Sequence, residues 1–287
     1  MTGLPPPDWP YAAASRIVAS RPHRWHVQET GAGPEILLLH GAGGSTHSFR
    51  GLMTALQARY RLIAVDLPGQ GFTRLGTRLR CGLDPIADDI ATLCKQEGWR
   101  PSAVIGHSAG AAIALRLAPG WGCPVVTLNG ALEPFEGVAG WLFPVLARLL
   151  AVNPLASLAV SQGAALTGVQ GMLATGDTGL DATGAAFYGR LISKRSHVDA
   201  TLAMMAQWDL RRLSDSLPQI AVPVLLIAGE RDRAVPPAVS ARAAARLPKA
   251  RLETVPGQGH LLHEVAIDET ATRIARFLEA YAPARPG

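Results

Sequence analysis

The chain has 287 residues, of which 48% are hydrophobic and 17% are charged. This apolar content excludes an intrinsically disordered chain, because burying so much apolar surface offsets the entropy of ordering, and three cysteines are too few for a disulfide scaffold of this length. The formal charge of +5 does not predict nucleic-acid binding, because the basic residues form no run and accompany no recognisable binding module.

Short apolar runs alternate along the chain with segments of helical periodicity. Several runs are continuously apolar (ILLL, LIAV, VVTL and VLLIA), which is typical of strands covered by helices on both faces. The expected strands are Trp25–Thr30, Glu35–His40, Leu62–Asp66, Ala103–Gly106, Pro124–Leu128, Val224–Ala228 and Arg251–Val255. The expected helices are Phe49–Ala58, Pro85–Glu97, Ala109–Leu117, Ala238–Arg246 and Glu269–Tyr281. This alternation predicts an α/β fold with a mostly parallel, doubly wound sheet.

The regular alternation stops near Glu133 and resumes near Leu217. Alanine, leucine, glycine and methionine are frequent between these points, which predicts several short helices and no strand. An insertion at this place in an α/β chain lies over the carboxyl ends of the strands, where open sheets bind ligands. We therefore expect core segments at residues 1–132 and 214–287, with a helical cap at residues 133–213 between them.

The most apolar stretch of the chain runs from Trp141 to Val160, inside the expected cap. It contains Arg148 and is broken by Pro144 and Pro154, so we interpret it as cap helices rather than as a membrane span. The first residues, MTGLPPPDWP, show neither a charged leader nor an apolar run, so no secretory signal is expected. Together with dispersed cysteines that form no CxxC pair, this predicts a cytoplasmic protein with no transmembrane segment.

The pentapeptide Gly106-His107-Ser108-Ala109-Gly110 fits the pattern G-x-S-x-G. It follows an expected strand and precedes the helix-forming segment AAIALRLA, which is the context that this pattern requires. A serine on such a tight turn projects its hydroxyl above the sheet, and small flanking residues allow the strand and the helix to approach closely. The pattern therefore predicts Ser108 as a nucleophile. The alternative is a plain glycine-rich turn.

A serine hydroxyl is a weak nucleophile until a base removes its proton. His260 is the predicted base, because it follows the expected strand at 251–255 in the loop PGQGHLLHE. Asp232 is the predicted acid that orients it, because it follows the strand at 224–228. The order Ser108, Asp232, His260, with each residue after a separate strand, is that of the α/β-hydrolases. Glu133 is the alternative acid, because it follows the strand at 124–128.

By these residues the chain resembles the α/β-hydrolase superfamily over nearly its whole length. The motif HGAGG at 40–44 follows an apolar strand and resembles the oxyanion loop of that fold. The resemblance implies that the backbone N–H groups of Ala42 and Ala109 stabilise an oxyanion. An alternative interpretation of HGAGG is a dinucleotide-binding loop with Asp66 on the ribose. It lacks the third glycine of G-x-G-x-x-G, because Thr46 stands in that place.

A narrower resemblance extends from residue 8 to residue 264. The chain resembles the BchO family, the magnesium chelatase accessory proteins of photosynthetic bacteria, in the segments DWPYAAASR, RWHVQETG, LLLHGAGGSTHSFR, DLPGQGFT, GHSAGAA, LNGALEPF, MMAQWDL and GQGHLLHE. This resemblance implies a place in bacteriochlorophyll biosynthesis, near magnesium insertion into protoporphyrin IX, without fixing a reaction. Gln70 departs from the related pattern DLPGHGFT, and we expect it to affect a turn and not the triad.

Other polar residues near these motifs have simpler interpretations. We expect His107 to pack beside Ser108, and His40 to brace the oxyanion loop by hydrogen bonding. His263 forms H-x-x-H with His260, which matches no zinc motif. The expected cap also contains several polar side chains that could contact substrate carboxylates. We expect them to form a solvated face instead, and they are Arg190, Lys194, Arg195 and His197.

The sequence favours a serine hydrolase that transfers an acyl group to water, with Ser108, His260 and Asp232 as nucleophile, base and orienting acid. An ester is the expected substrate class, and this chemistry requires no metal or organic cofactor. The apolar cap favours an apolar small-molecule substrate such as a tetrapyrrole. The alternative is a non-catalytic accessory protein that retains the triad and binds a porphyrin or the magnesium chelatase subunits.

Overall fold

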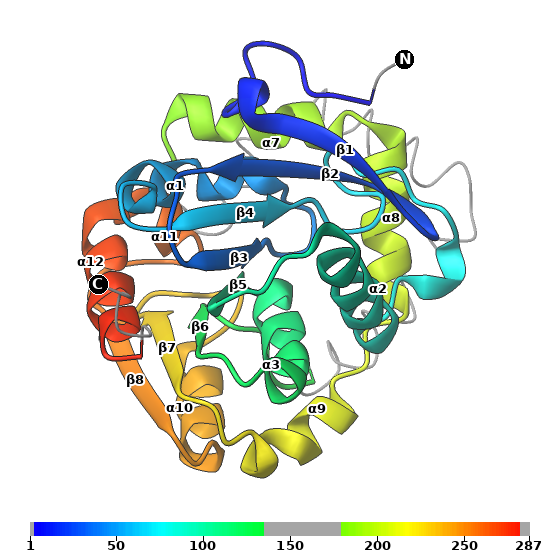
Figure 1. The fold of residues 1–287 in the computed structure, drawn as a ribbon. Helices are drawn as coiled ribbons and strands as arrows, with labels where there is room; N and C mark the ends of the chain where they lie inside the picture. The colour runs from blue at the N-terminus through cyan, green and yellow to red at the C-terminus, as the bar shows by residue number, and fades with distance from the viewer. Residues whose placement is uncertain (1–2, 135–178, 282–287) are drawn as a thin grey trace.

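The computed structural model describes residues 3–134 and 179–281, which contain an eight-stranded sheet. Its strands are β1 (Ser15–Ser20), β2 (His23–Thr30), β3 (Glu35–Leu39), β4 (Arg61–Val65), β5 (Ala103–His107), β6 (Val125–Leu128), β7 (Val224–Gly229) and β8 (Ala250–Val255). Their order is β1-β2-β4-β3-β5-β6-β7-β8, and each neighbouring pair from β4 to β8 is parallel. The predicted α/β fold with a mostly parallel sheet is confirmed (Figure 1).

The central strands are buried on both faces. Leu37 and Leu39 of β3 pack in one hydrophobic cluster, whereas Ile36 and Leu38 of the same strand pack in another. Because neighbouring side chains of a strand point to opposite faces, a strand that is covered twice needs apolar residues at every position. This is why the central strands read as continuous apolar runs in the sequence.

Two layers of helices cover the sheet, and α7 and α8 lie in the expected cap. The helices are α1 (Arg50–Leu56), α2 (Leu83–Glu97), α3 (Ala109–Trp121), α7 (Ala182–Ile192), α8 (Arg195–Ala206), α9 (Arg211–Ser216), α10 (Pro237–Arg246), α11 (Leu262–Val265) and α12 (Ile267–Glu279). Helices α2, α3 and α10 bury residues in the cluster of Leu37, and α1, α11 and α12 bury residues in the cluster of Ile36. Figure 1 shows α2 and α3 well apart from α1 and α12.

Strand β1 is absent from the predicted elements. It pairs antiparallel with β2 at the edge of the sheet, from Ser15 opposite Gln28 to Ser20 opposite His23. Only Val18 and Ser20 of this strand are buried. An edge strand that is half exposed carries no continuous apolar run, so it lacks the signal on which the central strands are predicted.

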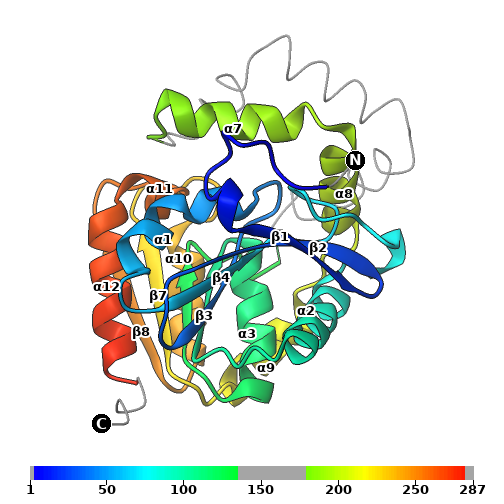
Figure 2. The same ribbon diagram turned by 45° about the horizontal axis from the view of Figure 1, so that its top comes forward.

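The described part of the expected cap consists of helices and the turns that join them. Helix α9 runs across the expected boundary between residues 213 and 214. Figure 2 shows α7 above the sheet beside the N-terminal segment, where Phe187 and Leu191 pack with Trp9. The apolar stretch from Trp141 to Val160 lies outside the described residues. None of the helices within residues 3–134 and 179–281 combines the length and the apolar character that a bilayer crossing requires.

Candidate active site

Ser108 occupies the sharp turn between β5 and α3. Its backbone has φ 51° and ψ −114°, a region that non-glycine residues rarely adopt. The chain approaches itself closely on both sides of this turn. A Cβ added at Gly106 would lie 2.2 Å from the carbonyl oxygen of Gly110, and one at Gly110 would lie 2.0 Å from the carbonyl oxygen of Leu39. Only glycine therefore fits at these two positions of G-x-S-x-G.

Backbone hydrogen bonds hold the strained Ser108 in place. Its N–H donates to Leu128 O at 3.0 Å, and its carbonyl accepts from the N–H groups of Ala111 and Ala131 at 3.1 Å each. Backbone strain of this kind costs about 1–3 kcal/mol, and it persists only where surrounding contacts fix the conformation. The end of β6 and the first turn of α3 supply those contacts.

Asp232 and His260 form a hydrogen-bonded pair across the ends of β7 and β8. His260 Nδ1 lies 2.7 Å from Asp232 Oδ2, and the carboxylate is fully buried. Asp232 Oδ1 accepts from the N–H groups of Ala234 at 2.8 Å and Val235 at 2.9 Å, so both carboxylate oxygens have donors. Because the ring donates its Nδ1–H to Asp232, Nε2 is the nitrogen that can accept a proton.

Asn129, at the end of β6, fixes the backbone that carries His260. Its Nδ2 donates to Gly259 O at 3.0 Å and to His260 O at 2.8 Å, while its Oδ1 accepts from Gly229 N at 2.7 Å. The motifs in the sequence do not point to this residue. Its position does offer one signal, because Asn129 directly follows an expected strand, as Asp232 follows another.

His107 lies beside Ser108 as expected, and it also contacts the His260 loop. Its Nε2–H donates to His260 O at 3.0 Å, and its ring packs against those of His260 and His263. Burial, together with the two neighbouring histidines, holds the pKa of His107 well below its usual range. A neutral ring that already donates its proton to a carbonyl supports the loop and does not act as a second base.

The alternative acid, Glu133, has a different partner. Its carboxylate pairs with Arg242 at 2.6 Å, whereas the partner of the His260 ring is Asp232. Within the described residues, the geometry therefore favours Asp232 over Glu133 as the group that orients the imidazole.

The expected oxyanion donors lie in the same cavity as Ser108 and His260. Ala42 and Ala109 both line that cavity. Ala109 is the first residue of α3, so its N–H has no acceptor inside the helix. In the part of the chain that the structure describes, no hydrogen bond engages the N–H of Ala42. Among the described residues, neither N–H group is therefore engaged by an acceptor, which is what the expected oxyanion role requires.

His40 braces the loop at 41–44, as the sequence predicted. Its Nδ1–H donates to Gly41 O at 2.7 Å, and its Nε2 accepts from Leu67 N at 2.9 Å. The turn is closed by Gly44 N, which donates to Gly41 O at 3.0 Å. This bracing fixes the end of the loop that emerges from β3.

The carboxylate of Asp66 is hydrogen-bonded to groups of the protein and is not open to a ligand. It is fully buried, and it accepts from His26 Nδ1 at 2.7 Å, Thr46 N at 2.7 Å and Phe72 N at 2.8 Å. Burial opposes ionisation, but His26 and these donors outweigh it and hold the pKa of Asp66 at about 2. A carboxylate in this environment cannot bind a ribose, so the dinucleotide alternative fails.

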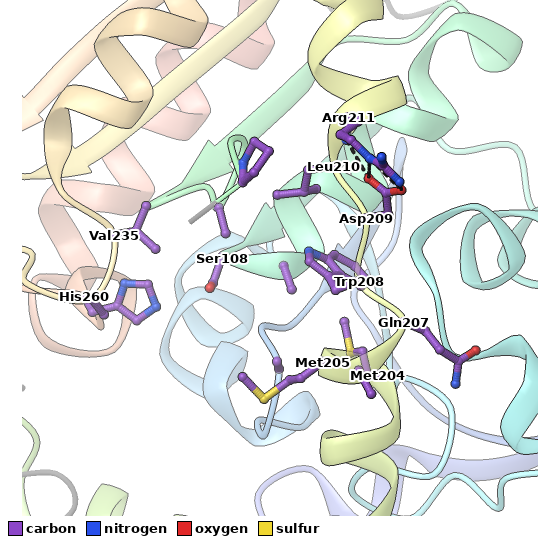
Figure 3. Close-up of a pocket in the computed structure, with 16 residues that line it drawn as sticks. Ser108, Met204, Met205, Gln207, Trp208, Asp209, Leu210, Arg211, Val235 and His260 are labelled. Carbon is purple, nitrogen blue, oxygen red and sulfur yellow. Dashed lines mark hydrogen bonds and ion pairs between the residues drawn. The ribbon is translucent and has the colours of Figure 1, made fainter. Parts of the chain in front are cut away.

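The cavity around Ser108 has a volume of about 430 Å³. Figure 3 shows Ser108 and His260 projecting into it from one side, opposite the chain from Met204 to Arg211. Apolar side chains dominate its walls, namely Met204, Met205, Trp208, Leu210 and Val235. The described lining also contains an ion pair, between Arg211 and Asp209 at 2.6 Å.

Gln70, which departs from the related pattern, contacts the oxyanion loop as well as shaping its own turn. Its Oε1 accepts from Gly43 N at 2.7 Å, and its Nε2 lies 3.1 Å from Met204 Sδ. The expectation that Gln70 affects only a turn is therefore incomplete, because its amide spans from the loop to cap helix α8.

Three of the four polar cap residues named above are basic and bind groups of the protein outside the cavity. Arg190 pairs with Asp8 at 2.8 Å, Arg195 lies 3.7 Å from Asp199, and Lys194 Nζ lies 3.6 Å from the ring centroid of Phe72. None of them belongs to the described lining of the cavity.

The expected solvated face is wrong for the fourth residue, His197, which is only 2% exposed. Its ring lies between α8 and the loops that carry Gly43 and Gly71, and it hydrogen-bonds to both. Sequence pattern alone could not find this contact, because it depends on how α8 is placed over the core.

Comparison with known proteins shows which family the chain resembles. The family model of the alpha/beta hydrolase fold matches residues 34–266. The "Magnesium-chelatase 30 kDa subunit" of Rhodobacter capsulatus is 49% identical over 278 residues, which cover 96% of this chain and 98% of that protein. The expected resemblance to a magnesium chelatase protein is thereby confirmed.

Two further likenesses are more distant. A pimeloyl-acyl-carrier-protein methyl ester esterase of Xanthomonas oryzae pv. oryzae is 30% identical over 268 residues, which cover 88% of this chain and 98% of the relative. Among solved structures, the epoxide hydrolase CorEH superposes with a TM-score of 0.78 at 20% identity, covering 93% of this chain and 99% of the other. At that identity the superposition shows the shared fold alone.

Proposed function

The chain belongs to the α/β-hydrolase fold family, and we propose that it is a serine hydrolase that cleaves an ester or a related acyl bond. One observation carries this proposal. Ser108 and His260 share a cavity, and Asp232 binds the Nδ1 side of the His260 ring at 2.7 Å. The esterase relative at 30% identity supports the same reaction class.

In the proposed mechanism, Ser108 Oγ attacks the carbonyl carbon while its proton passes to His260 Nε2. Asp232 keeps the proton on Nδ1 and stabilises the imidazolium that forms. The N–H groups of Ala42 and Ala109 donate to the developing oxyanion. His260 then protonates the leaving alcohol, and a water activated by the same base hydrolyses the acyl-enzyme. Ser108, His260, Ala42 and Ala109 line the cavity, and Asp232 acts through His260.

We propose a bulky, apolar substrate for this site. The cavity of about 430 Å³ has walls of methionine, tryptophan, leucine and valine side chains, which favour apolar groups over polar ones. The relative named as a magnesium chelatase subunit supports a place in or beside bacteriochlorophyll biosynthesis, at the magnesium-chelatase stage. A tetrapyrrole is therefore the first ligand class to test.

We also propose a cytoplasmic location, which the buried, unpaired thiols of Cys81, Cys94 and Cys123 favour.

A second candidate function is a non-catalytic accessory role. The relative at 49% identity is named as a subunit and not as an enzyme, which favours binding of a porphyrin or of the chelatase. Such a protein would retain the geometry around Ser108 without needing its chemistry. Both candidates use the same cavity, so an experiment must separate chemistry from binding.

Labelling with a fluorophosphonate probe tests the chemistry directly. Wild-type protein is expected to be labelled at Ser108 and to hydrolyse p-nitrophenyl esters, whereas Ser108→Ala should show neither property. Absence of labelling in correctly folded wild-type protein would contradict the proposed hydrolase.

Complementation then tests whether the chemistry serves the pathway. A photosynthetic strain that lacks this protein is supplied with wild-type or Ser108→Ala protein at matched expression, and its pigment intermediates are measured. Failure of the variant to restore pigment supports the hydrolase. Full restoration by the variant favours the accessory role.

A further inference from the structure

His197 is a buried cap residue whose two ring nitrogens both contact core loops. Nδ1 lies 3.0 Å from Gly71 N, and Nε2 lies 3.1 Å from Gly43 O. Gly71 N–H can only donate, so Nδ1 must be the unprotonated acceptor. The proton is therefore on Nε2, which donates to Gly43 O. The two backbone groups fix the tautomer without any other partner.

The surroundings of His197 keep its ring neutral. Burial lowers the pKa of His197 to about 4, helped by His40 and Lys194 and opposed by the Gly43 carbonyl and Asp66. The donor–acceptor arrangement is consequently intact throughout the neutral pH range. Protonation would remove the acceptor that Gly71 N–H requires.

Hydrogen bonds hold both backbone polar groups of Gly43. Its carbonyl accepts from His197, and its N–H donates to Gln70 Oε1, whose amide in turn contacts Met204. His197 and Met204 are both residues of α8. The far end of the loop at 41–44 is thus held by the cap, whereas its near end is held by His40 in the core.

We propose that His197 is a positioning residue that sets the oxyanion hole from the cap. Gly43 is bonded directly to Ala42, which lines the cavity and whose N–H is an expected oxyanion donor. The Gly43 N–H belongs to the peptide group next to the one that carries the Ala42 N–H, and the Gly43 carbonyl belongs to the peptide group after that. Holding both of them, through Gln70 and His197, restricts the backbone rotations that would turn the Ala42 N–H. This inference rests on the proposed hydrolase function. It adds that α8 shapes the transition-state contact as well as the cavity wall.

The first test compares His197→Leu with His197→Gln. Leucine fills similar space without hydrogen bonds, whereas the glutamine amide offers one acceptor and one donor, as the neutral ring does. Hydrolysis of p-nitrophenyl butyrate is measured, and kcat is expressed per active site counted by fluorophosphonate labelling. We expect His197→Leu to lower kcat by about 10- to 100-fold with little change in KM, because a misplaced donor weakens transition-state binding selectively. His197→Gln should recover most of the loss.

The control is Asp199→Asn, which alters an ion pair of the same helix and should leave kcat unchanged. A merely structural role would reduce the number of labelled sites but not kcat per site.

If His197→Leu does not fold, Gln70→Leu replaces it, because it removes the other hydrogen bond that holds Gly43 and should give the same loss in kcat. A kcat per site within about twofold of wild type overturns the inference. Inactive, unlabelled wild-type protein contradicts the hydrolase itself, so the two failures are distinguishable.

Discussion

The two walls of the cavity are held in place by different kinds of contact. On the core wall, the backbone of Ser108 is bonded to the backbone of β6 and α3, and Asp232 accepts from two backbone N–H groups. On the cap wall, α8 is joined to the core through the side chain of His197. Helix α7 contributes no residue to the described lining of the cavity and is attached to the core through Tyr188, whose hydroxyl donates to Glu264 at 2.7 Å.

This difference separates what the fold imposes from what single side chains decide. The strand ends bring the core wall together in any chain that forms this sheet, because backbone ladders set their positions. The cap wall depends on a few buried polar side chains, and replacing one of them leaves its partner unsatisfied at about 1–3 kcal/mol. We therefore expect core variants to change the rate most and cap variants to change stability and positioning.

The largest expected effect is that of Asp232→Asn in the core wall. Asparagine keeps the shape, but its amide cannot hold the imidazole in the tautomer that leaves Nε2 free, so kcat should fall by about 10⁴-fold. Steady-state hydrolysis of a p-nitrophenyl ester measures this loss. Glu133→Gln is the matched control, because Glu133 pairs with Arg242 and should be replaceable without loss of activity. A large loss in the control with none in Asp232→Asn would reverse the assignment of the acid.

A smaller effect is expected from Asn129→Asp, which keeps the acceptor for Gly229 N but replaces the donor to Gly259 O and His260 O. The new carboxylate oxygen faces two carbonyl oxygens, so we expect a stability loss of about 3 kcal/mol and a lower kcat. Urea unfolding at pH 7 and ester hydrolysis measure both.

Thr127→Val, in the strand that Asn129 follows, is the control for the Asn129 variant. Thr127 Oγ1 is buried and has no hydrogen-bond partner within residues 3–134 and 179–281, so its removal should cost little. Equal stability of the Asn129→Asp variant and wild type would show that the His260 loop does not depend on Asn129.

The contrast between the walls also explains how much the sequence could predict. The central strands are predictable because burial on both faces demands continuous apolar runs. Ser108, Asp232 and His260 are predicted because each follows a separate expected strand, although the strand before His260 carries no continuous apolar run. Their roles in catalysis stay predictions, but the structure places Ser108 and His260 in one cavity and Asp232 against His260.

The other features of the fold and of the site depend on tertiary contacts, which leave no local pattern in the sequence. β1 is a half-exposed edge strand, and Asn129 acts through its amide on a loop more than a hundred residues away. His197 was expected in solvent because a histidine among Arg195 and Lys194 resembles an exposed helix face. Its burial follows from the placement of α8 over two core loops, which only the tertiary structure shows.

The smallest expected effect concerns the attachment of α7 and carries a pH signature. Glu264 accepts from Tyr188 and pairs with Arg50, and it is buried. Burial raises the pKa of Glu264 to about 7, against the opposing effects of Arg50 and Tyr188. Because the folded state holds this proton more tightly than the unfolded chain, its contribution to stability is lost as the pH rises from about 4.5 to about 7.

Tyr188→Phe removes the hydroxyl donor and keeps the ring that packs against His47. The carboxylate loses more than the protonated acid does, because hydrogen bonds to charged groups are stronger. We expect a stability loss of about 1 kcal/mol at pH 6 and about 2 kcal/mol at pH 8, measured by urea unfolding. Tyr11→Phe is the matched control, because its hydroxyl bonds to Thr54 at the exposed surface and should cost little at either pH. A loss that is equal at both pH values would mean that Glu264 is already ionised at pH 6, and the cap would then be attached by a permanent ion pair with Arg50.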